Sequence, residues 1–164
     1  MSSARQQPSD AATVGVIMRP PLFYLACLLL GLALDQVLPS PLTLPEAVLI
    51  RWTGGGGLIV VGLAIMAAGT RNFSRVATPV RSNQPVRALV TTGIHGWSRN
   101  PIYIGMFLLY AGIGIVARSP WVLILALPLL IIVHYGVVAR EEAYLERRFG
   151  DAYRDYKAHV RRWL

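Results

Sequence analysis

Apolar residues gather in four long blocks along the chain, at residues 21–38, 47–69, 101–117 and 121–139. Each block holds roughly 17 to 23 residues, which as an α-helix is long enough to cross the apolar core of a bilayer. Residues 1–19 are polar and aperiodic, which is typical of a mobile tail. The pattern therefore predicts an all-α integral membrane protein with four transmembrane helices, in which residues 20–164 form a single membrane domain.

Two short connections predict two helical hairpins. The sequence LPSPLTLPE between the first two blocks contains three prolines, which forbid a continuous helix. Asp35 and Arg51 stand at similar depth on the two sides of that turn, where we expect them to form an ion pair. Only the tripeptide RSP separates the third block from the fourth. These two helices must therefore be antiparallel, which returns the end of the fourth to the membrane face where the third begins.

Glycines recur every seven residues in the second and third blocks. They are Gly55, Gly62 and Gly69 in one block, and Gly105 and Gly112 in the other. Small residues at helical spacing allow membrane helices to approach closely. We therefore interpret both glycine rows as packing surfaces.

The net charge of +8 changes meaning once the charges are placed along the chain. Fourteen of the sixteen Lys and Arg residues lie in the N-terminal tail, in residues 70–100, or after Ala139. By the positive-inside rule that side is cytoplasmic, so both termini are predicted to be cytoplasmic. We also predict a bacterial-type inner membrane, with the active site at its cytoplasmic face. The charge thus indicates topology and contact with anionic membrane lipids, and we predict no nucleic-acid partner.

A lone Cys27 and scattered histidines also predict no metal site.

The polar tail after the fourth block keeps a helical pattern. Apolar residues recur there at steps of three and four among Arg and Lys, from Leu145 to Trp163. This pattern predicts a C-terminal amphipathic helix on the cytoplasmic interface, broken at Gly150.

The segment GWSRNPIYIG at residues 96–105 places polar residues directly before the third block. Asn100 followed by Pro101 is a strong helix-start signal, because Asn caps free amides and Pro at the first position loses no hydrogen bond. With Arg99 beside it, the same helix start also offers amide donors and a bidentate cation to an anion. Capping alone and anion binding are both open interpretations of this segment.

The returning fourth helix brings acidic residues to the same face. With 3.6 residues per turn, Glu141 is expected under His134 and Glu142 under Tyr135. The two glutamates either pair with the arginines of the next turn or bind a positive or hydroxyl-bearing part of a ligand. Aromatic residues that stand between the two halves serve either packing or binding, and they are Tyr103, Phe107, Tyr110 and Tyr135.

Two stretches together resemble a known family. They are LVTTGIHGWSRNPIYIG at residues 89–105 and REEAYLERRFGDAYRDYKAHVRRWL at residues 140–164, and they resemble the isoprenylcysteine carboxyl methyltransferase and phospholipid methyltransferase family. The likeness covers residues 70–164, the expected cofactor-binding half. It implies a small integral membrane enzyme that uses S-adenosylmethionine to methylate a lipophilic acceptor, either a prenylcysteine-like carboxylate or a phospholipid amine.

The resemblance also implies site residues. The positions that match the cofactor motifs are Arg99, Asn100, Pro101, Tyr103, Gly105, Glu141 and Glu142. We expect His95, Arg99 and Glu141 to act in catalysis, and Tyr110, His134 and Tyr135 to contact the acceptor. A carboxylate acceptor is already ionised at neutral pH, whereas an amine must first lose a proton, for which His95, His134 and Glu141 are the candidate bases.

Two other functions stay open at this point. Membrane sterol reductases resemble the same family in their C-terminal half, which would imply a nicotinamide-dependent reduction. A non-catalytic membrane scaffold would need RNP only as a helix cap and the two glutamates only as a solvated helix end.

Overall fold

The computed structural model describes residues 20–39, 42–44, 47–75 and 88–164, so the tail predicted over residues 1–19 lies outside the described part. All elements of secondary structure in the described residues are helices, and none is a strand, which confirms the all-α class. In chain order the elements are α1 (Pro20–Val37), α2 (Val48–Arg75), the 3₁₀ turn η1 (Gly93–Gly96), α3 (Pro101–Val116), α4 (Pro120–Ile132), the π-helical turn η2 (Val133–Val138), α5 (Ala139–Phe149) and α6 (Asp151–His159).

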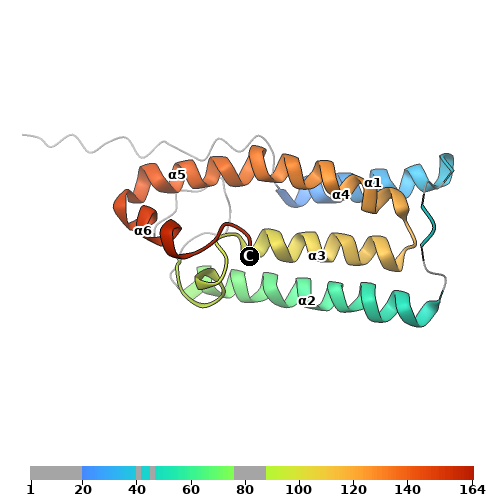
Figure 1. The fold of residues 1–164 in the computed structure, drawn as a ribbon, viewed down its shortest axis with the longest axis horizontal. Coiled ribbons are helices and arrows are strands. Elements are labelled where there is room, and N and C mark those ends of the chain that lie inside the picture. Colours follow the sequence, from blue (N-terminus) through green and yellow to red (C-terminus); the bar gives the residue numbers. More distant parts are fainter. Residues whose placement is uncertain (1–19, 40–41, 45–46, 76–87) are drawn as a thin grey trace, which may run out of the picture.

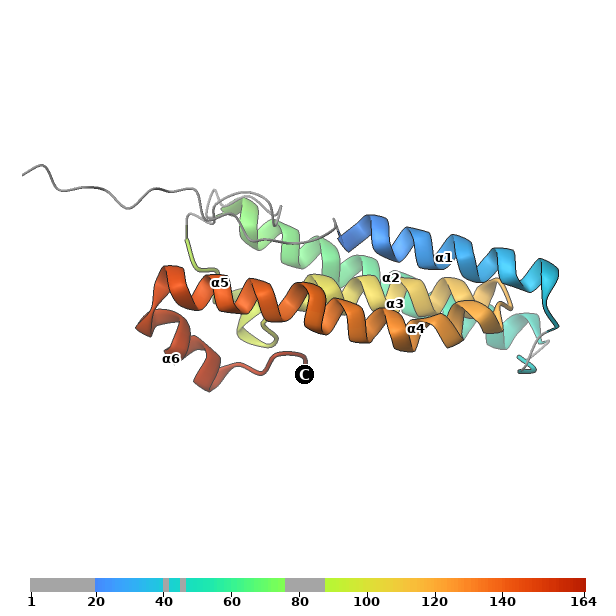
Figure 2. The same ribbon diagram turned by 90° about the horizontal axis from the view of Figure 1, so that it is seen from above.

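The long helices run side by side along one axis (Figure 1). Helix α3 packs against α2 and α4, and α1 packs mainly against α4. The chain turns back at α6, so that its C-terminus lies beside the start of α3 (Figures 1 and 2). Three helical stretches, Pro20–Val37, Val48–Ser74 and Pro120–Phe149, are long and apolar enough to cross a membrane, and α3 is a shorter apolar helix. The protein is thus an integral membrane protein by helix length and composition.

Helix α2 extends beyond the predicted second span. The apolar block ends at Gly69, whereas the helix continues to Arg75. In the extension, the Thr70 hydroxyl donates to the Met66 carbonyl at 2.9 Å, and the Ser74 hydroxyl donates to the Thr70 carbonyl at 3.2 Å. The predicted block at 47–69 ends too early for the helix. Hydropathy marks only the end of the apolar surface, while helical backbone hydrogen bonding continues into polar sequence.

The predicted fourth span and the polar helix after it form one continuous 30-residue helix, Pro120–Phe149. Its regular repeat is interrupted by the π turn η2. An i→i+5 turn contains about one residue more than an α turn, which shifts the following residues by about 100° relative to a 3.6-residue count. The predicted alignment of Glu141 under His134 is therefore wrong, and Glu142 takes that position.

The glycine rows bring α2 and α3 into close contact, as predicted. A β-carbon on Gly105 would lie 2.6 Å from the Gly62 carbonyl oxygen, and one on Gly112 would lie 2.6 Å from the Gly55 carbonyl oxygen. Real β-carbons do not approach so closely, so backbone meets backbone only because these side chains are absent. Gly69 is tight for the same reason, because a β-carbon there would lie 2.7 Å from Ile102 Cγ1.

The turn between α3 and α4 is as tight as the tripeptide RSP predicts. Ser119 caps α4 by accepting a hydrogen bond from Val122 N at 3.1 Å. The expected pairing of Asp35 with Arg51 is wrong, because Arg51 Nη2 donates to the Val116 carbonyl at 2.8 Å instead. Carbonyls at a helix end have no partner within the helix and carry partial negative charge, so they attract a cation.

Candidate cofactor site

The segment before α3 folds against the polar end of α2. Gly93 has φ of +60°, and a β-carbon there would lie 2.5 Å from Asn72 Nδ2, so glycine is required at this turn. Asn72 Nδ2 donates to the Thr92 carbonyl at 2.8 Å and lies 3.4 Å from His95 Nδ1. The Phe73 ring meets the His95 ring edge-on, with centroids 5.0 Å apart. Burial lowers the pKa of His95, so its imidazole is neutral at neutral pH.

Helix α3 begins at Pro101, as predicted, but the Asn100 side chain does not cap it. The first helical hydrogen bond runs from Ile104 N to the Asn100 carbonyl at 3.2 Å. The Asn100 amide instead donates to the Arg162 carbonyl at 3.0 Å. The reason is that the C-terminal segment lies across the start of α3 and supplies a carbonyl acceptor there.

A cluster of two arginines and one buried glutamate joins three parts of the chain. We call Arg99, Glu142 and Arg162 the arginine–glutamate cluster. Arg99 Nη1 lies 3.3 Å from Glu142 Oε1, and both side chains are 10% exposed. Arg162 binds the same carboxylate through Nε, at 3.1 Å from each oxygen, and through Nη2, at 2.7 Å from Oε2. These hydrogen bonds raise the pKa of Arg162, and the cluster has one positive charge in excess.

Two tyrosines of α6 close the cluster from the side. Tyr153 is 1% exposed, and its hydroxyl is hydrogen bonded to Arg99. Burial raises the pKa of Tyr153 to about 12, with a further contribution from the negative charge of Glu142. Tyr156 donates to the His95 carbonyl at 2.6 Å, and burial raises its pKa as well. Both phenols therefore stay protonated and act as neutral hydrogen-bonding groups.

Glu141 faces a different partner from Glu142. The Tyr103 hydroxyl, from the first turn of α3, donates to Glu141 Oε1 at 2.9 Å. This bond ties α3 to α5 beside the arginine–glutamate cluster. Of the predicted cofactor residues, Arg99, Asn100, Pro101, Tyr103, Glu141 and Glu142 thus lie together, and Gly105 faces α2 instead.

The π turn η2 presents His134 to the C-terminal segment. Arg162 Nη1 lies 3.0 Å from His134 Nε2, and Trp163 Nε1 lies 3.2 Å from His134 Nδ1. The neighbouring Tyr135 is 69% exposed and meets the His134 ring edge-on, with centroids 4.6 Å apart. His134 and Tyr135 are therefore near the cluster, at the point where the helix passes from apolar to polar sequence.

Two predicted residues lie away from the cluster. Tyr110 is 3% exposed in the apolar core, where its ring contacts Tyr24 with centroids 6.2 Å apart. Its hydroxyl has no hydrogen-bond partner among the described residues. The His95 ring packs on α2, although its backbone is tied to Tyr156. The catalytic role of His95 and the acceptor contact of Tyr110 remain predictions.

Sequence reasoning missed the C-terminal return of the chain. Tyr153, Tyr156 and Trp163 were recognised only as apolar steps of an amphipathic helix, and Arg162 was not singled out. The helix break at Gly150 was predicted, and its φ of +54° confirms it. The sequence did offer one signal, a helix break at Gly150 followed by two arginines near the end of the chain. Spacing alone could not show which residues these arginines would contact.

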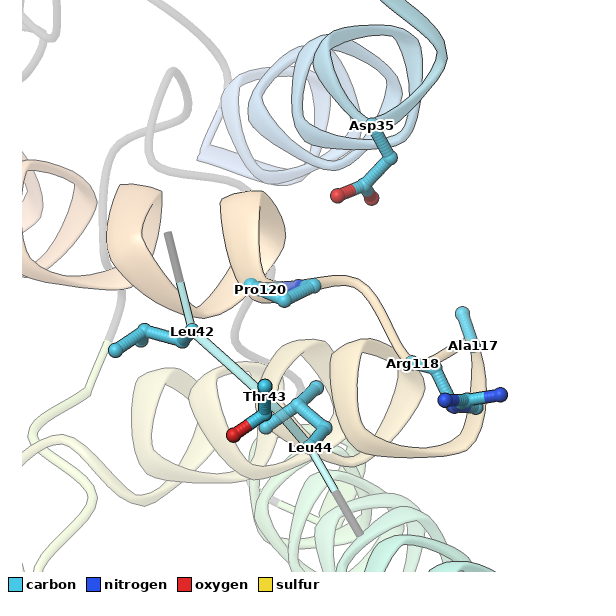
Figure 3. A pocket seen from close by; sticks show the side chains of 7 residues that line it. All are labelled: Asp35, Leu42, Thr43, Leu44, Ala117, Arg118 and Pro120. Atoms are coloured by element: carbon cyan, nitrogen blue, oxygen red, sulfur yellow. The ribbon is translucent and has the colours of Figure 1, made fainter. Parts of the chain in front are cut away.

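A separate cavity lies at the other end of α3, and Figure 3 shows the side chains that line it. It has a volume of about 660 Å³ and is lined by Asp35, Leu42, Thr43, Leu44, Ala117, Arg118 and Pro120. The whole length of α3 separates it from Arg99. It is therefore distinct from the candidate cofactor site.

Comparison with known proteins identifies the family of the chain. The family described as phospholipid methyltransferase matches residues 50–152. Curated relatives named protein-S-isoprenylcysteine O-methyltransferase include those of Rattus norvegicus, 29% identical over 71% of this chain and 42% of the relative, and Tribolium castaneum, 31% identical over 68% and 41%. The relative of that name in Saccharomyces cerevisiae is 30% identical over 63% of this chain and 44% of its own length.

The chain spans about two fifths of the length of these curated relatives. No solved structure matches it. The matched residues nevertheless include α3, α4, η2, α5 and most of α2, and with them Arg99, Glu141 and Glu142. Since the family match covers well over half of the chain, this protein belongs to the phospholipid methyltransferase family.

Proposed function

We propose that this protein is a membrane methyltransferase that binds S-adenosylmethionine and methylates a lipophilic acceptor. The observation that supports this most directly is the pairing of Arg99 with Glu142 at 3.3 Å. The two residues are 43 positions apart in sequence and belong to the two motifs of the family resemblance. The relatives named above are methyltransferases, which favours methyl transfer over nicotinamide-dependent reduction.

The donors and acceptors around the cluster fit such a cofactor. Arg99 Nε and Nη1 are buried and make no hydrogen bond in the described part of the chain, although Nη1 lies within ion-pair distance of Glu142. The cofactor carries a carboxylate, which matches unsatisfied guanidinium donors beside the start of a helix. The carboxylate of Glu141, already oriented by Tyr103, suits an ammonium or ribose hydroxyl. No metal is needed in this proposal, and no group of metal ligands is found in the described residues.

Each residue then has a stated task. Arg99 and the amides at the start of α3 bind the cofactor carboxylate, with Asn100 and Pro101 shaping that start. Glu142 keeps the arginines in place, and Glu141 with Tyr103 binds the polar groups on the other side. Gly105 lets α3 approach α2 closely enough to bring Tyr103 to its position. The bound cofactor would supply an electrophilic methyl group on a sulfonium, so the protein has mainly to align the acceptor and exclude water.

The acceptor decides whether a base is required. A prenylcysteine-like carboxylate needs none, whereas a phospholipid amine must be deprotonated. His95 is neutral, and within the described residues Asn72 makes its only polar ring contact, at Nδ1. Both ring nitrogens of His134 face donors from the tail. We propose that Tyr110, His134 and Tyr135 contact the lipid tail of the acceptor.

The proposal includes a topology. The four helices α1, α2, α3 and α4 would span a bacterial-type inner membrane, with both termini and the arginine–glutamate cluster at the cytoplasmic face. Helix α3 has only 16 residues and is about 24 Å long, whereas the apolar core of a bilayer is about 30 Å thick. Either the bilayer would thin around α3, or α3 would lie nearly parallel to the membrane normal. Helices α5 and α6 would lie at the cytoplasmic interface, beside anionic lipids.

The test is binding followed by turnover. Calorimetry on the purified protein in detergent should show binding of S-adenosylhomocysteine and none of NADPH. Incubation with methyl-labelled S-adenosylmethionine should then label either phosphatidylethanolamine in vesicles or a prenylcysteine analogue. Binding of NADPH alone would favour the reductase. Unchanged binding in Arg99→Ala, or no methylated product from either acceptor, would favour the scaffold.

A further inference from the structure

The C-terminal segment, residues 160–164, crosses the start of α3 in a defined register. Arg99 N donates to the Arg161 carbonyl at 3.0 Å. The Arg162 carbonyl accepts from Asn100 Nδ2 at 3.0 Å and from Ser98 Oγ at 3.4 Å. Ser98 and Asn100 are buried, so these bonds are shielded from water. The side chain of Arg162 therefore points in a fixed direction, towards Glu142.

His134 cannot satisfy both of its neighbours in the tail. A guanidinium and an indole are donors only, and a neutral imidazole has a single acceptor nitrogen. Arg162 Nη1 and Trp163 Nε1 nevertheless face its two different ring nitrogens, at 3.0 and 3.2 Å. A protonated ring would accept from neither. At least one of these donors is therefore left without an acceptor in every protonation state of His134.

The arginine–glutamate cluster also has more hydrogen-bond donors than acceptors around Arg99. Arg99 is nine-tenths buried. Among the described residues its Nε and Nη1 make no hydrogen bond, although Nη1 lies 3.3 Å from Glu142 Oε1 in the ion pair. Arg99 and Arg162 share the single carboxylate of Glu142, so the three side chains together carry one positive charge in excess. A second carboxylate would supply one negative charge and lone pairs for these donors.

We propose that Arg162 is a second cation for the cofactor carboxylate, so that the C-terminal segment is a wall of the cofactor site. This inference rests on the proposed function. In it, Glu142 orients both guanidinium groups, and Arg162 Nη1 turns from His134 to the bound carboxylate. Trp163 then keeps its hydrogen bond to His134 Nδ1. Arg162 is 35% exposed at its side chain, so a ligand can reach it from the aqueous side.

The experiment compares two ligands that differ only in the carboxylate. Calorimetry would measure S-adenosylhomocysteine and its decarboxylated analogue, which keeps the amine, on the full chain in detergent. Arg162→Gln is expected to weaken S-adenosylhomocysteine by about tenfold or more, the usual effect of losing a charged hydrogen bond. The affinity for the decarboxylated analogue should stay unchanged. Arg161→Gln, which removes the same charge from an exposed neighbouring side chain, should leave both affinities unchanged.

Each other outcome would overturn the proposal in a recognisable way. Equal weakening of both ligands would show that Arg162 only supports the fold, and tighter binding of S-adenosylhomocysteine would show that the tail blocks the site. If the Arg162→Gln protein does not fold, Arg162→Lys replaces it, because lysine keeps the positive charge but not the two-pronged guanidinium. A smaller loss of affinity is then expected, again for S-adenosylhomocysteine and not for the decarboxylated analogue. Absence of binding to the unmodified protein would instead refute the proposed function itself.

Discussion

Glu142 is the residue on which the candidate site depends most. Its carboxylate lies between Arg99 and Arg162 and is 10% exposed. Replacing Glu142 with Gln would leave the buried guanidinium of Arg99 and the partly exposed guanidinium of Arg162 without this counter-ion. Removing one partner of a buried ion pair costs about 3–5 kcal/mol, so the unfolding midpoint of Glu142→Gln in detergent should fall markedly. Binding of S-adenosylhomocysteine should be lost as well, because the two arginines are no longer oriented.

Glu146→Gln is the matched control for this substitution. Glu146 lies one turn further along α5 and pairs with Lys157 at 3.0 Å, but both side chains are well exposed. Exposed pairs contribute about 0–1 kcal/mol, so thermal unfolding should change little. Equal destabilisation by the two substitutions would contradict a special role for Glu142.

His95 should make stability depend on pH. The unfolded chain takes up a proton near the ordinary His pKa of about 6.5, whereas burial lowers the pKa of His95 in the folded state. Below pH 6.5 the unfolded state therefore binds more protons, and stability falls as the pH decreases. The slope contributed by His95 is at most about 1.4 kcal/mol per pH unit. Unfolding measured between pH 7.5 and 5.5 should show this loss, and His95→Gln should reduce it, while the exposed His159→Gln should not.

At the scale of elements, the contact of α2 with α3 depends on absent side chains. In Gly105→Ala the new β-carbon would lie 2.6 Å from the Gly62 carbonyl oxygen and from Met66 Cγ. Overpacking of this kind costs about 1–3 kcal/mol, and a shift of α3 would change the position of Tyr103 relative to Glu141. Both the unfolding midpoint and the affinity for S-adenosylhomocysteine are expected to fall.

Gly57→Ala separates this steric effect from the general effect of alanine in a helix. A β-carbon at Gly57 would meet nothing within 4 Å. Alanine there should stabilise α2 by about 0.5–1 kcal/mol, because glycine is a poor helix former. A loss of stability in Gly57→Ala as large as that in Gly105→Ala would argue against close packing as the cause.

The helices could be predicted from sequence much better than their ends and their phase. Periodicity and proline placed α1, the start of α3 at Pro101 and the tight turn before α4 correctly. The end of α2 was misplaced because apolar sequence stops before the hydrogen bonding does. The π turn at Val133–Val138 has no signature in hydropathy, so the faces of the glutamates were assigned one residue off.

At the scale of the whole molecule, the proposed topology makes a labelling prediction. In a Cys27→Ser background, a cysteine at Thr43, in the turn between α1 and α2, should react with a membrane-impermeant maleimide on intact cells. A cysteine at Lys157, on α6, should react only after permeabilisation. The reason is that the proposed four spans would place these two positions on opposite sides of the membrane. Labelling of both on intact cells, or the reverse order, would contradict the topology.

The candidate site could be half predicted from sequence. The residues of each motif were recognisable because cap, cation and paired carboxylates are local patterns, and the RSP turn implied that they meet. Arg162 and Trp163 could not be found in this way, because their place depends on a reversal at Gly150 and on carbonyls that bind Ser98 and Asn100. Such long-range backbone contacts leave no periodic trace in the sequence.

The π turn also decides where the chain tolerates a change in length. A regular helix turns about 100° per residue, so deleting one residue elsewhere in Pro120–Phe149 would rotate one flank against the other. Deleting Gly136 would convert η2 to ordinary α-helix and leave both flanks in their present orientation, because the turn already contains the extra residue. Glu142 should then still face Arg99, whereas deletion of Leu127 should abolish binding of S-adenosylhomocysteine. Calorimetry of S-adenosylhomocysteine binding to the two deletion variants would show whether the π turn can lose one residue without loss of the site.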